Sequence, residues 1–370
     1  MHHPFRVMTL SGAWQPAHGT LMARRRARIW LGPWLAAMLA ACGDGAGPEP
    51  PNPDPDTTAT RNAAIAFTRS VERLDTNALV IVDLATRRER ILDDQRLTGW
   101  IDWSPDGRYL ALTGLYDWIR VLEPEGDVDA RVYPRTGGFD TPRWSPDARR
   151  IAFRFQAPGS NGEIRVATLA DGTSVDVSRD ASRDAYAPDW SGDGTRVTYM
   201  AQNRTTFVWE IWVAAADGSA RAQVPIPNQG HQPRWSPVAD RLVYEAQGIW
   251  AVNPDGGNLA PLTPHCNDDG TCDREWEYHT PRWSPDGSRV VLVGGAAGES
   301  DLWLVNADGS DFHLLVRGGG DPQWSPEGDR VAYVAFAVTT AIFLVDPDGG
   351  TVTQLTDGLV RHDLPRWRPR

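Results

Sequence analysis

Trp283-Ser284-Pro285-Asp286-Gly287 is one copy of a short segment that returns along this chain of 370 residues at intervals of 41 to 48 residues, counted from Trp to Trp. The other copies are Trp103-Ser104-Pro105-Asp106-Gly107, Trp144-Ser145-Pro146-Asp147-Ala148, Trp190-Ser191-Gly192-Asp193-Gly194, Trp235-Ser236-Pro237, Trp324-Ser325-Pro326-Glu327-Gly328 and a truncated seventh, Pro365-Arg366-Trp367-Arg368-Pro369. Repeats of this length that combine turn signals with alternating apolar residues are typical of four-stranded propeller blades.

Each repeat has an interpretation in terms of local chemistry. In the Ser-Pro-Asp-Gly turn, proline presets φ, aspartate bonds nearby backbone and glycine adopts a positive φ. An alternating strand such as Arg330-Val331-Ala332-Tyr333 follows, then a more apolar one such as Ile342-Phe343-Leu344-Val345. A hairpin turn, Asp346-Pro347-Asp348-Gly349, and a short outer strand, Thr353-Gln354-Leu355, complete the unit. We expect the bulky repeated Trp to fill the space between adjacent blades.

The two ends of the repeat region complement each other. Ala64-Ile65-Ala66-Phe67 matches the strand that follows the Trp turn, and the segment around Trp367 matches the strand that precedes it. Pairing of the C-terminal strand with the N-terminal three would close the ring without a free edge. The sequence therefore predicts an all-β protein, a β-propeller over residues 61–370 with seven four-stranded blades.

Composition excludes several kinds of chemistry. All 37 basic residues are arginine, so lysine Schiff bases, a P-loop lysine and pyridoxal phosphate attachment are excluded. After residue 42 the chain carries 32 Arg against 48 Asp and Glu, a formal charge of −16. An acidic body repels phosphate backbones, so nucleic acid is not an expected partner.

The N-terminal region reads as an export signal. Arg24-Arg25-Arg26-Ala27-Arg28 precedes an apolar run of signal-peptide length that ends in Leu39-Ala40-Ala41-Cys42. This ending resembles a bacterial lipobox, which implies cleavage before Cys42 and acylation of that residue. We expect residues 1–41 to be a signal peptide, with Met22 as an alternative start. Residues 42–60 would be the lipidated cysteine and a Pro/Gly/acidic tether that cannot fold by itself.

The form Pro-x-Trp-Ser-Pro-Asp-Gly resembles the TolB-type propeller, a WD40-like repeat family that also supplies the propellers of prolyl oligopeptidase-like peptidases and of oligogalacturonate lyase. The resemblance covers about residues 61–370 and is specific for fold rather than function. TolB carries an additional N-terminal domain where this chain has only the predicted tether, so the role of TolB itself is not implied.

Motifs of catalysis are missing from the sequence. It contains no Gly-x-Ser-x-Gly elbow, no Gly-x-Gly-x-x-Gly, no Walker sequence and no His-Glu-x-x-His. This favours a binding protein over an enzyme and leaves catalysis open. Cys266 and Cys272 are predicted to form a disulfide in an exported protein, with zinc binding together with His265 as the alternative. Asp268-Asp269 between them is a Ca²⁺ candidate or a solvated turn.

Polar residues lie four positions before the repeated Trp and are predicted to line the mouth of the central channel. They are Asp140, Tyr186, His231, His279 and Asp363, with His362 adjacent and glycine at positions 99 and 320. His and Asp are suitable ligands for a divalent metal, and resemblance to oligogalacturonate lyase implies that His231 and His279 would hold it. The alternative is a hydrated polar channel without a metal.

These observations predict a lipoprotein of the bacterial cell envelope, on the outer membrane or facing the periplasm, whose propeller binds or scaffolds a protein, peptide or glycan. The loops 203–209 and 263–278 are the expected recognition surfaces, with Phe207, Trp209, Trp276 and Tyr278 either in contact with a partner or packed on the blades. The alternative is a metal-dependent, carbohydrate-active enzyme of the oligogalacturonate lyase type with its site at the channel mouth. A third is a purely structural module of a larger complex.

Overall fold

The computed structural model describes residues 63–71, 76–93, 97–114, 118–125, 129–131, 137–264, 277–296, 299–336, 340–349, 351–357 and 362–369. The chain divides into two units at residues 54 and 55, and every described residue belongs to the second. The predicted signal peptide, Cys42 and the tether up to residue 60 lie outside the described residues. No helix in the described part has the length and apolar character needed to cross a membrane.

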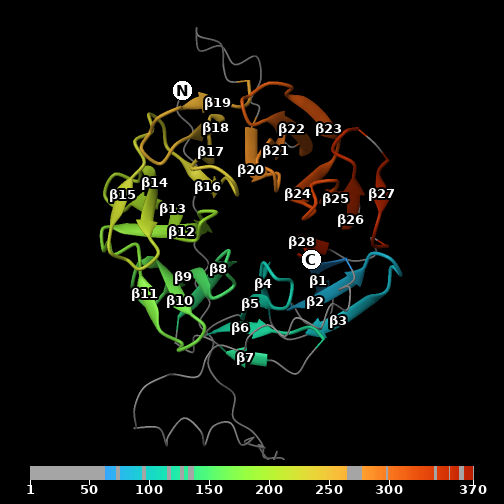
Figure 1. Ribbon diagram of the computed structural model, residues 1–370, viewed down its shortest axis with the longest axis horizontal. Coiled ribbons are helices and arrows are strands. Elements are labelled where there is room, and N and C mark those ends of the chain that lie inside the picture. Colours follow the sequence, from blue (N-terminus) through green and yellow to red (C-terminus); the bar gives the residue numbers. More distant parts are fainter. Residues whose placement is uncertain are drawn as a thin grey trace, which may run out of the picture. The chain divides into compact units, whose positions relative to one another are not determined.

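The described strands form seven antiparallel sheets of four strands, arranged as blades of a ring (Figure 1). Blade 1 contains β28 (His362–Trp367), β1 (Ala64–Val71), β2 (Thr76–Asp83) and β3 (Glu89–Asp93). Blade 2 contains β4 (Leu97–Trp103), β5 (Leu110–Gly114), β6 (Ile119–Leu122) and β7 (Asp129–Arg131). Blade 3 contains β8 (Gly138–Trp144), β9 (Arg150–Gln156), β10 (Gly162–Thr168) and β11 (Ser174–Asp176). Blade 4 contains β12 (Arg183–Trp190), β13 (Arg196–Asn203), β14 (Trp209–Ala215) and β15 (Arg221–Gln223).

The remaining blades follow the same order. Blade 5 contains β16 (His231–Trp235), β17 (Leu242–Ala246), β18 (Gly248–Val252) and β19 (Ala260–Pro261). Blade 6 contains β20 (Glu277–Trp283), β21 (Arg289–Gly295), β22 (Asp301–Asn306) and β23 (His313–Val316). Blade 7 contains β24 (Gly319–Trp324), β25 (Val331–Phe336), β26 (Thr340–Val345) and β27 (Thr353–Gln354). In every blade the repeated Trp is the last residue of the innermost strand, directly before the turn.

Pairing of the two chain ends closes the ring, as the sequence predicts. In β28, Trp367 lies opposite Ile65 of β1, and Arg366 opposite Ala66. Beyond this strand, Arg368 holds the neighbouring blade 2: its Nε donates to the carbonyl of Gly107 at 2.8 Å, and its two terminal nitrogens donate to the carboxylate of Glu125 at 2.6 and 2.8 Å. The seven-bladed, all-β prediction is confirmed.

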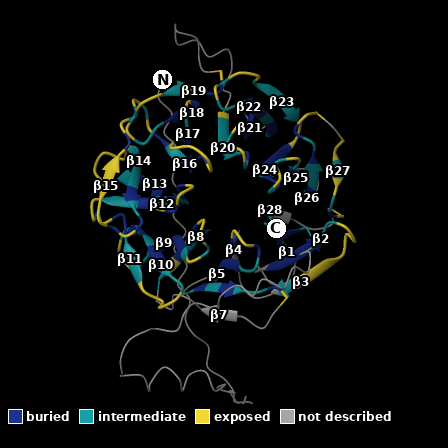
Figure 2. Cartoon of the chain, viewed as in Figure 1, coloured by how far each residue is buried: buried dark blue, intermediate teal, exposed yellow. Residues whose placement is uncertain are grey.

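The core of the propeller is a series of interfaces between adjacent blades, which appear as buried segments within the ring (Figure 2). One interface joins Ile164 and Val166 of blade 3 to Trp190, Val197 and Tyr199 of blade 4. Both faces of the strands carry apolar side chains, because each blade is covered on both sides by its neighbours. The apolar residues therefore pack between adjacent blades and do not form one central hydrophobic core.

The repeated Trp residues join neighbouring blades by hydrogen bonds as well as by packing. In six of the seven, the indole Nε1 donates to the backbone carbonyl of the residue that precedes the Trp in the previous blade. The pairs, at 3.0 to 3.3 Å, are Trp103 with Arg366, Trp144 with Asp102, Trp190 with Arg143, Trp283 with Arg234, Trp324 with Arg282 and Trp367 with Gln323. Their expected role between blades is confirmed.

The turn after each Trp is stabilised by its own side chains. In the copy that opens with Trp283, the hydroxyl of Ser284 donates to Asp286 at 2.6 Å, and the same oxygen accepts the backbone N–H of Arg289 at 2.9 Å. Asp286 also accepts the backbone N–H and the hydroxyl of Ser288. These hydrogen bonds lower the pKa of Asp286 from 3.8 to about 2. The motif therefore fixes the position at which each inner strand ends.

Candidate functional site

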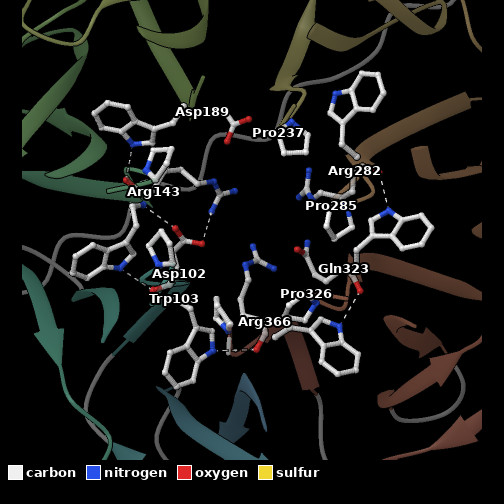
Figure 3. Close-up of a pocket in the computed structure, with 18 of the residues that line it drawn as sticks. Asp102, Trp103, Arg143, Asp189, Pro237, Arg282, Pro285, Gln323, Pro326 and Arg366 are labelled. Atoms are coloured by element: carbon white, nitrogen blue, oxygen red, sulfur yellow. Dashed lines mark hydrogen bonds and ion pairs between the residues drawn. The ribbon is translucent and has the colours of Figure 1, made fainter. Parts of the chain in front are cut away.

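A cavity of about 540 Å³ lies on the ring axis where the inner strands run into the Trp turns. Its walls come from the Trp residues, from the prolines of the turns that follow them, and from the residue directly before each Trp. Figure 3 shows these last side chains pointing from different blades toward one common opening. We call this space the turn-side cavity, and we call the seven residues before the Trp positions the ring residues.

The ring residues are all polar. In order around the ring, from blade 2 through blade 7 to blade 1, they are Asp102, Arg143, Asp189, Arg234, Arg282, Gln323 and Arg366. Four guanidinium groups thus share one space with two carboxylates. The turn-side cavity is cationic within a protein body that is acidic overall.

The two aspartates of the ring bond the neighbouring blade. Asp102 accepts the backbone N–H of Trp144 at 2.9 Å, and Asp189 accepts that of Trp235 at 2.8 Å. Arg143 lies 3.8 Å from Asp102, the one ion pair among the described ring residues. Burial raises the pKa of Asp102, while the charge of Arg143 and the hydrogen bond from Trp144 act in the opposite direction.

The other three arginines have weaker partners. Arg234, Arg282 and Arg366 each donate to the carbonyl of the proline before them, at 3.3, 3.1 and 2.9 Å. Burial and the nearby arginine charges lower the pKa of Arg282 to about 9 and that of Arg366 to about 10, and they also lower the pKa of Arg234 well below its ordinary value. A guanidinium keeps its proton in proteins. The cavity therefore holds positive charge that its own walls do not neutralise.

Three of the predicted channel residues lie elsewhere on the inner strands, in one line of contacts across blades 3, 4 and 5. Asp140 pairs with Arg154 at 3.2 Å, and the guanidinium of Arg154 lies 4.3 Å from the centre of the Tyr186 ring. Tyr186 in turn packs on Trp209, with ring centres 5.5 Å apart, and Trp209 packs on His231 at 5.1 Å. The structure thus joins Asp140, Tyr186 and His231 through Arg154 and Trp209, away from the lining of the turn-side cavity.

His279 is separate from this line of contacts. Burial lowers its pKa, as it does the pKa of His231, and the charges of Glu277 and Asp321 act against that shift. His362 and Asp363 lie on β28 opposite Arg69 and Thr68 of β1, and their side chains lie outside the described residues. Cys266 and Cys272, with the loop around them, also lie outside.

The predicted metal site does not fit the described side chains. Among them, no three His, Cys, Asp or Glu residues lie close enough to share a metal ion. Asp140 is engaged by Arg154, and the ring of His231 packs on Trp209. We therefore derive no chemical step through a metal.

The aromatic residues of the predicted recognition loops divide between packing and exposure. Trp209 and Tyr278 are packed, the latter edge-on against Phe312 with ring centres 5.7 Å apart. Phe207 at the β13–β14 hairpin is 68% exposed and has a positive φ of 59°. Trp276 lies outside the described residues. Of the described aromatics, Phe207 is thus the one that the hairpin presents to solvent.

The sequence carried a signal for the ring residues that the alternation of strand residues concealed. In blades 3 to 7 the inner strand has a bulge between the fourth and the first residue before Trp, and the third residue before Trp has a positive φ between 46° and 50°. The bulge changes the direction of the side chains that follow it. Aligning the seven copies and reading the column directly before Trp would have shown an all-polar position.

Comparison with known proteins shows the fold and leaves the ligand open. No family model matches the chain. An uncharacterized protein of Agrobacterium fabrum is 26% identical over 197 residues, which are 52% of this chain and 54% of the relative, so the chain spans about half the length of that curated relative. An oligogalacturonate lyase solved in complex with manganese superposes with a TM-score of 0.58 at 15% identity, covering 82% of this chain and 85% of the lyase. TolB from Acinetobacter baumannii superposes with a TM-score of 0.52 at 15% identity, covering 83% of this chain and 82% of TolB.

Fold and cavity together define the protein as a seven-bladed β-propeller with a polar, arginine-rich cavity on its axis. Its fold is TolB-like, and it is shared with oligogalacturonate lyases. Identities of 15% support the common fold and carry no conclusion about activity.

Proposed function

We propose that this protein is a lipid-anchored binding module of the bacterial cell envelope, which recognises a protein, peptide or glycan at its turn-side cavity. The observation that carries the proposal is the set of ring residues: seven blades each contribute one polar side chain to a single cavity. Only Asp102 and Asp189 use their side chains to bond the next blade, so the arginines and Gln323 are not explained by blade packing. The volume of the turn-side cavity lies in the range of ligand sites in proteins.

The chemistry of the walls supports binding rather than bond cleavage. The described lining residues include no His, Cys or Tyr that could act as nucleophile or general base. The two aspartates bond backbone N–H groups of the next blade. The remaining arginines and Gln323 are residue types that hold a ligand by hydrogen bonds and charge.

Membrane attachment belongs to the same proposal and depends on Cys42. Replacement of Cys42 by Ala is expected to move the protein from the membrane fraction to the soluble envelope fraction, because the acyl chains supply the anchoring free energy. A variant that remains with the membrane would contradict the lipid anchor without affecting the cavity.

The cavity itself is tested by a steric block. Gln323→Trp places a large side chain in the turn-side cavity, and Val352→Trp places the same side chain at an exposed position of the same blade. Full-length protein in detergent is used to capture partners from envelope extract, and each captured protein or glycan is then purified and titrated directly against all three proteins. We expect wild type and Val352→Trp to bind equally and Gln323→Trp to lose binding. Equal binding by all three would overturn the proposal.

The metal-dependent lyase is kept as an outcome of one assay. Polygalacturonate is incubated with the protein and Mn²⁺, and the unsaturated product of a lyase is followed by ultraviolet absorbance. Turnover that disappears in both His231→Ala and His279→Ala, with their melting temperatures unchanged, would replace the binding function with the enzymatic one.

A further inference from the structure

The charges of the ring residues are unevenly distributed around the axis. Blades 2, 3 and 4 contribute Asp102, Arg143 and Asp189, which we call the acidic arc. Blades 5, 6, 7 and 1 contribute Arg234, Arg282, Gln323 and Arg366, which we call the basic arc. The basic arc contains three guanidinium groups and no carboxylate. The turn-side cavity is therefore polarised from one side to the other.

Arg234 and Arg366 are buried and Arg282 is half-buried, and none of the three forms an ion pair within 4 Å among the described residues. The carboxylates of Asp189, Glu245 and Asp321 act on these arginines only at longer range. Arg234 is 8% exposed and Arg366 is 6% exposed. Among the described residues their guanidinium groups bond only carbonyl oxygens, here including the side-chain amide of Gln232, which accepts from Arg234 at 3.4 Å. The Nε of Arg234 has no hydrogen-bond partner in the described part of the chain. Buried charges without partners are costly, so this arrangement indicates a group that is to be bound.

We propose that the basic arc is a site for a carboxylate group, and that the ligand carries an N–H donor that faces the acidic arc. The planar guanidinium fork matches the two oxygens of a carboxylate. On the opposite side, Asp102 and Asp189 each use one carboxylate oxygen for a backbone N–H. The other oxygen of Asp102 lies 3.8 Å from Arg143, and that of Asp189 can accept from a ligand. This inference rests on the proposed function, since it describes the ligand of the same cavity.

The acidic arc selects a carboxylate over a phosphate. A doubly charged phosphate would approach Asp102 and Asp189 as well as the arginines, and like charges at close range are unfavourable. An α-carboxylate with an adjacent amine or amide N–H places one charge on the basic arc and a donor on the other side. Such a group occurs in a free amino acid and at the carboxyl end of a polypeptide.

The binding test uses full-length protein in detergent at low ionic strength, because salt screens charges that solvent reaches. The probes are acetyl-Ala-Ala-Ala with a free carboxylate, the same peptide as its C-terminal amide, L-alanine and inorganic phosphate. Calorimetry measures affinity, and the melting temperature reports binding to the folded state. We expect the free-carboxylate peptide to bind at least about tenfold more tightly than the amide, which is the effect of about 1.4 kcal/mol. Binding of L-alanine at equal affinity would assign the site to free amino acids rather than chain ends.

Opposite changes at one position supply the matched controls. Gln323→Glu should weaken binding of the free-carboxylate peptide by about tenfold or more, and Gln323→Arg should strengthen it, because a ligand charge next to a like charge is disfavoured. Arg317→Gln removes an arginine whose side chain is 78% exposed on blade 6 and should leave affinity unchanged. Circular dichroism and the melting temperature show that each variant is folded.

Three results would overturn the inference. They are equal binding of the free-carboxylate and amide peptides, tighter binding of phosphate than of the peptide, and equal affinity of Gln323→Glu and Gln323→Arg. If Gln323→Trp abolishes partner capture while these charge changes have no effect, the proposed function stands and the carboxylate site does not. If Gln323→Trp has no effect on capture, the proposed function itself fails.

Discussion

Arg282 and Trp283 are joined by one peptide bond and have opposite roles in the molecule. Trp283 reaches back to the previous blade, where its indole N–H donates to the carbonyl of Arg234. Arg282 reaches into the axial cavity, where its guanidinium donates to a proline carbonyl and forms no ion pair within 4 Å among the described residues. The same contrast recurs at Arg366 and Trp367: the indole N–H of Trp367 donates to the carbonyl of Gln323, whereas Arg366 donates only to a proline carbonyl. We call the repeated Trp residues the satisfied layer and the arginines of the basic arc the unsatisfied layer. Guanidinium groups without an ion pair at the same place in three blades are better explained by a ligand than by folding.

Removal of residues 361–370 would disrupt both layers at once and should have the largest effect. β28 supplies Arg366 to the ring residues and Trp367 to the Trp layer, and its loss exposes the edge of β1. We expect the truncated protein to lose its cooperative thermal transition by circular dichroism. A truncated protein that melts like wild type would show that the ring does not depend on this closure.

Replacement of one Trp tests the satisfied layer. Trp144 is 5% exposed and bonds Asp102 through both its backbone N–H and its indole N–H. Trp144→Ala should lower the free energy of unfolding by about 3–5 kcal/mol in urea denaturation, as large buried side chains do when truncated. Trp144→Phe, which keeps much of the packing and loses the indole donor, should cost less. Equal losses in the two variants would mean that the indole hydrogen bond, rather than packing, dominates.

Arg368 joins the closing strand to blade 2 and tests the closure without removing a strand. Arg368→Met keeps the aliphatic length of the side chain but loses the bonds to Gly107 and Glu125. We expect a loss of about 1–3 kcal/mol in the free energy of unfolding, toward the lower end because Glu125 is half exposed. Glu125→Gln, which leaves an acceptor for Arg368, is the milder comparison. An unchanged free energy of unfolding in Arg368→Met would show that this contact does not stabilise the closure of the ring.

The unsatisfied layer should respond with the opposite sign. Arg282→Gln removes a half-buried charge next to other arginines and is expected to raise the free energy of unfolding by up to about 1 kcal/mol in buffer without multivalent or organic anions. Addition of a bound anion should reduce or reverse this difference, because it stabilises wild type more. If Arg282→Gln destabilises the protein as Trp144→Ala does, the contrast between the two layers is wrong.

The turns after the Trp layer predict the smallest effect, which appears in acid. The pKa of Asp286 is about 2 in the folded protein, below its ordinary value of 3.8, so the unfolded chain binds the proton first as pH falls. Its contribution to stability is thus complete above pH 3.8 and is lost between that pH and about 2. Asp286→Asn should show a shallower fall of melting temperature across this interval than wild type. The same pH slope in both proteins would contradict the assignment.

The fold could be predicted from the sequence because each copy of the repeat contains the residues that determine its own turn and strands. The Ser284–Asp286 hydrogen bonds define a turn locally, and the complementary ends at Ile65 and Trp367 define the number of blades. The cavity was missed because it depends on a bulge and on the ring as a whole. A residue such as Thr280, with a φ of 50°, interrupts the alternation from which side-chain directions are inferred. The charge balance of the basic arc emerges only when residues 234 to 366 are brought around one axis.

One ring residue per blade has a consequence for how such a protein changes over time. In chain order the ring residues are Asp, Arg, Asp, Arg, Arg, Gln and Arg, one directly before each repeated Trp. At five of the positions, those with arginine or glutamine, a substitution leaves the hydrogen bonds of the Trp residues in place, because the indole of the next blade bonds only the backbone carbonyl there. At Asp102 and Asp189 a substitution also removes the side-chain bond to the backbone N–H of the next Trp. The selectivity of the cavity for its ligand can therefore change by one substitution at a time while the fold is kept. For any chain with this repeat, the residues directly before the repeated Trp can be listed from the sequence and compared with what the chain binds.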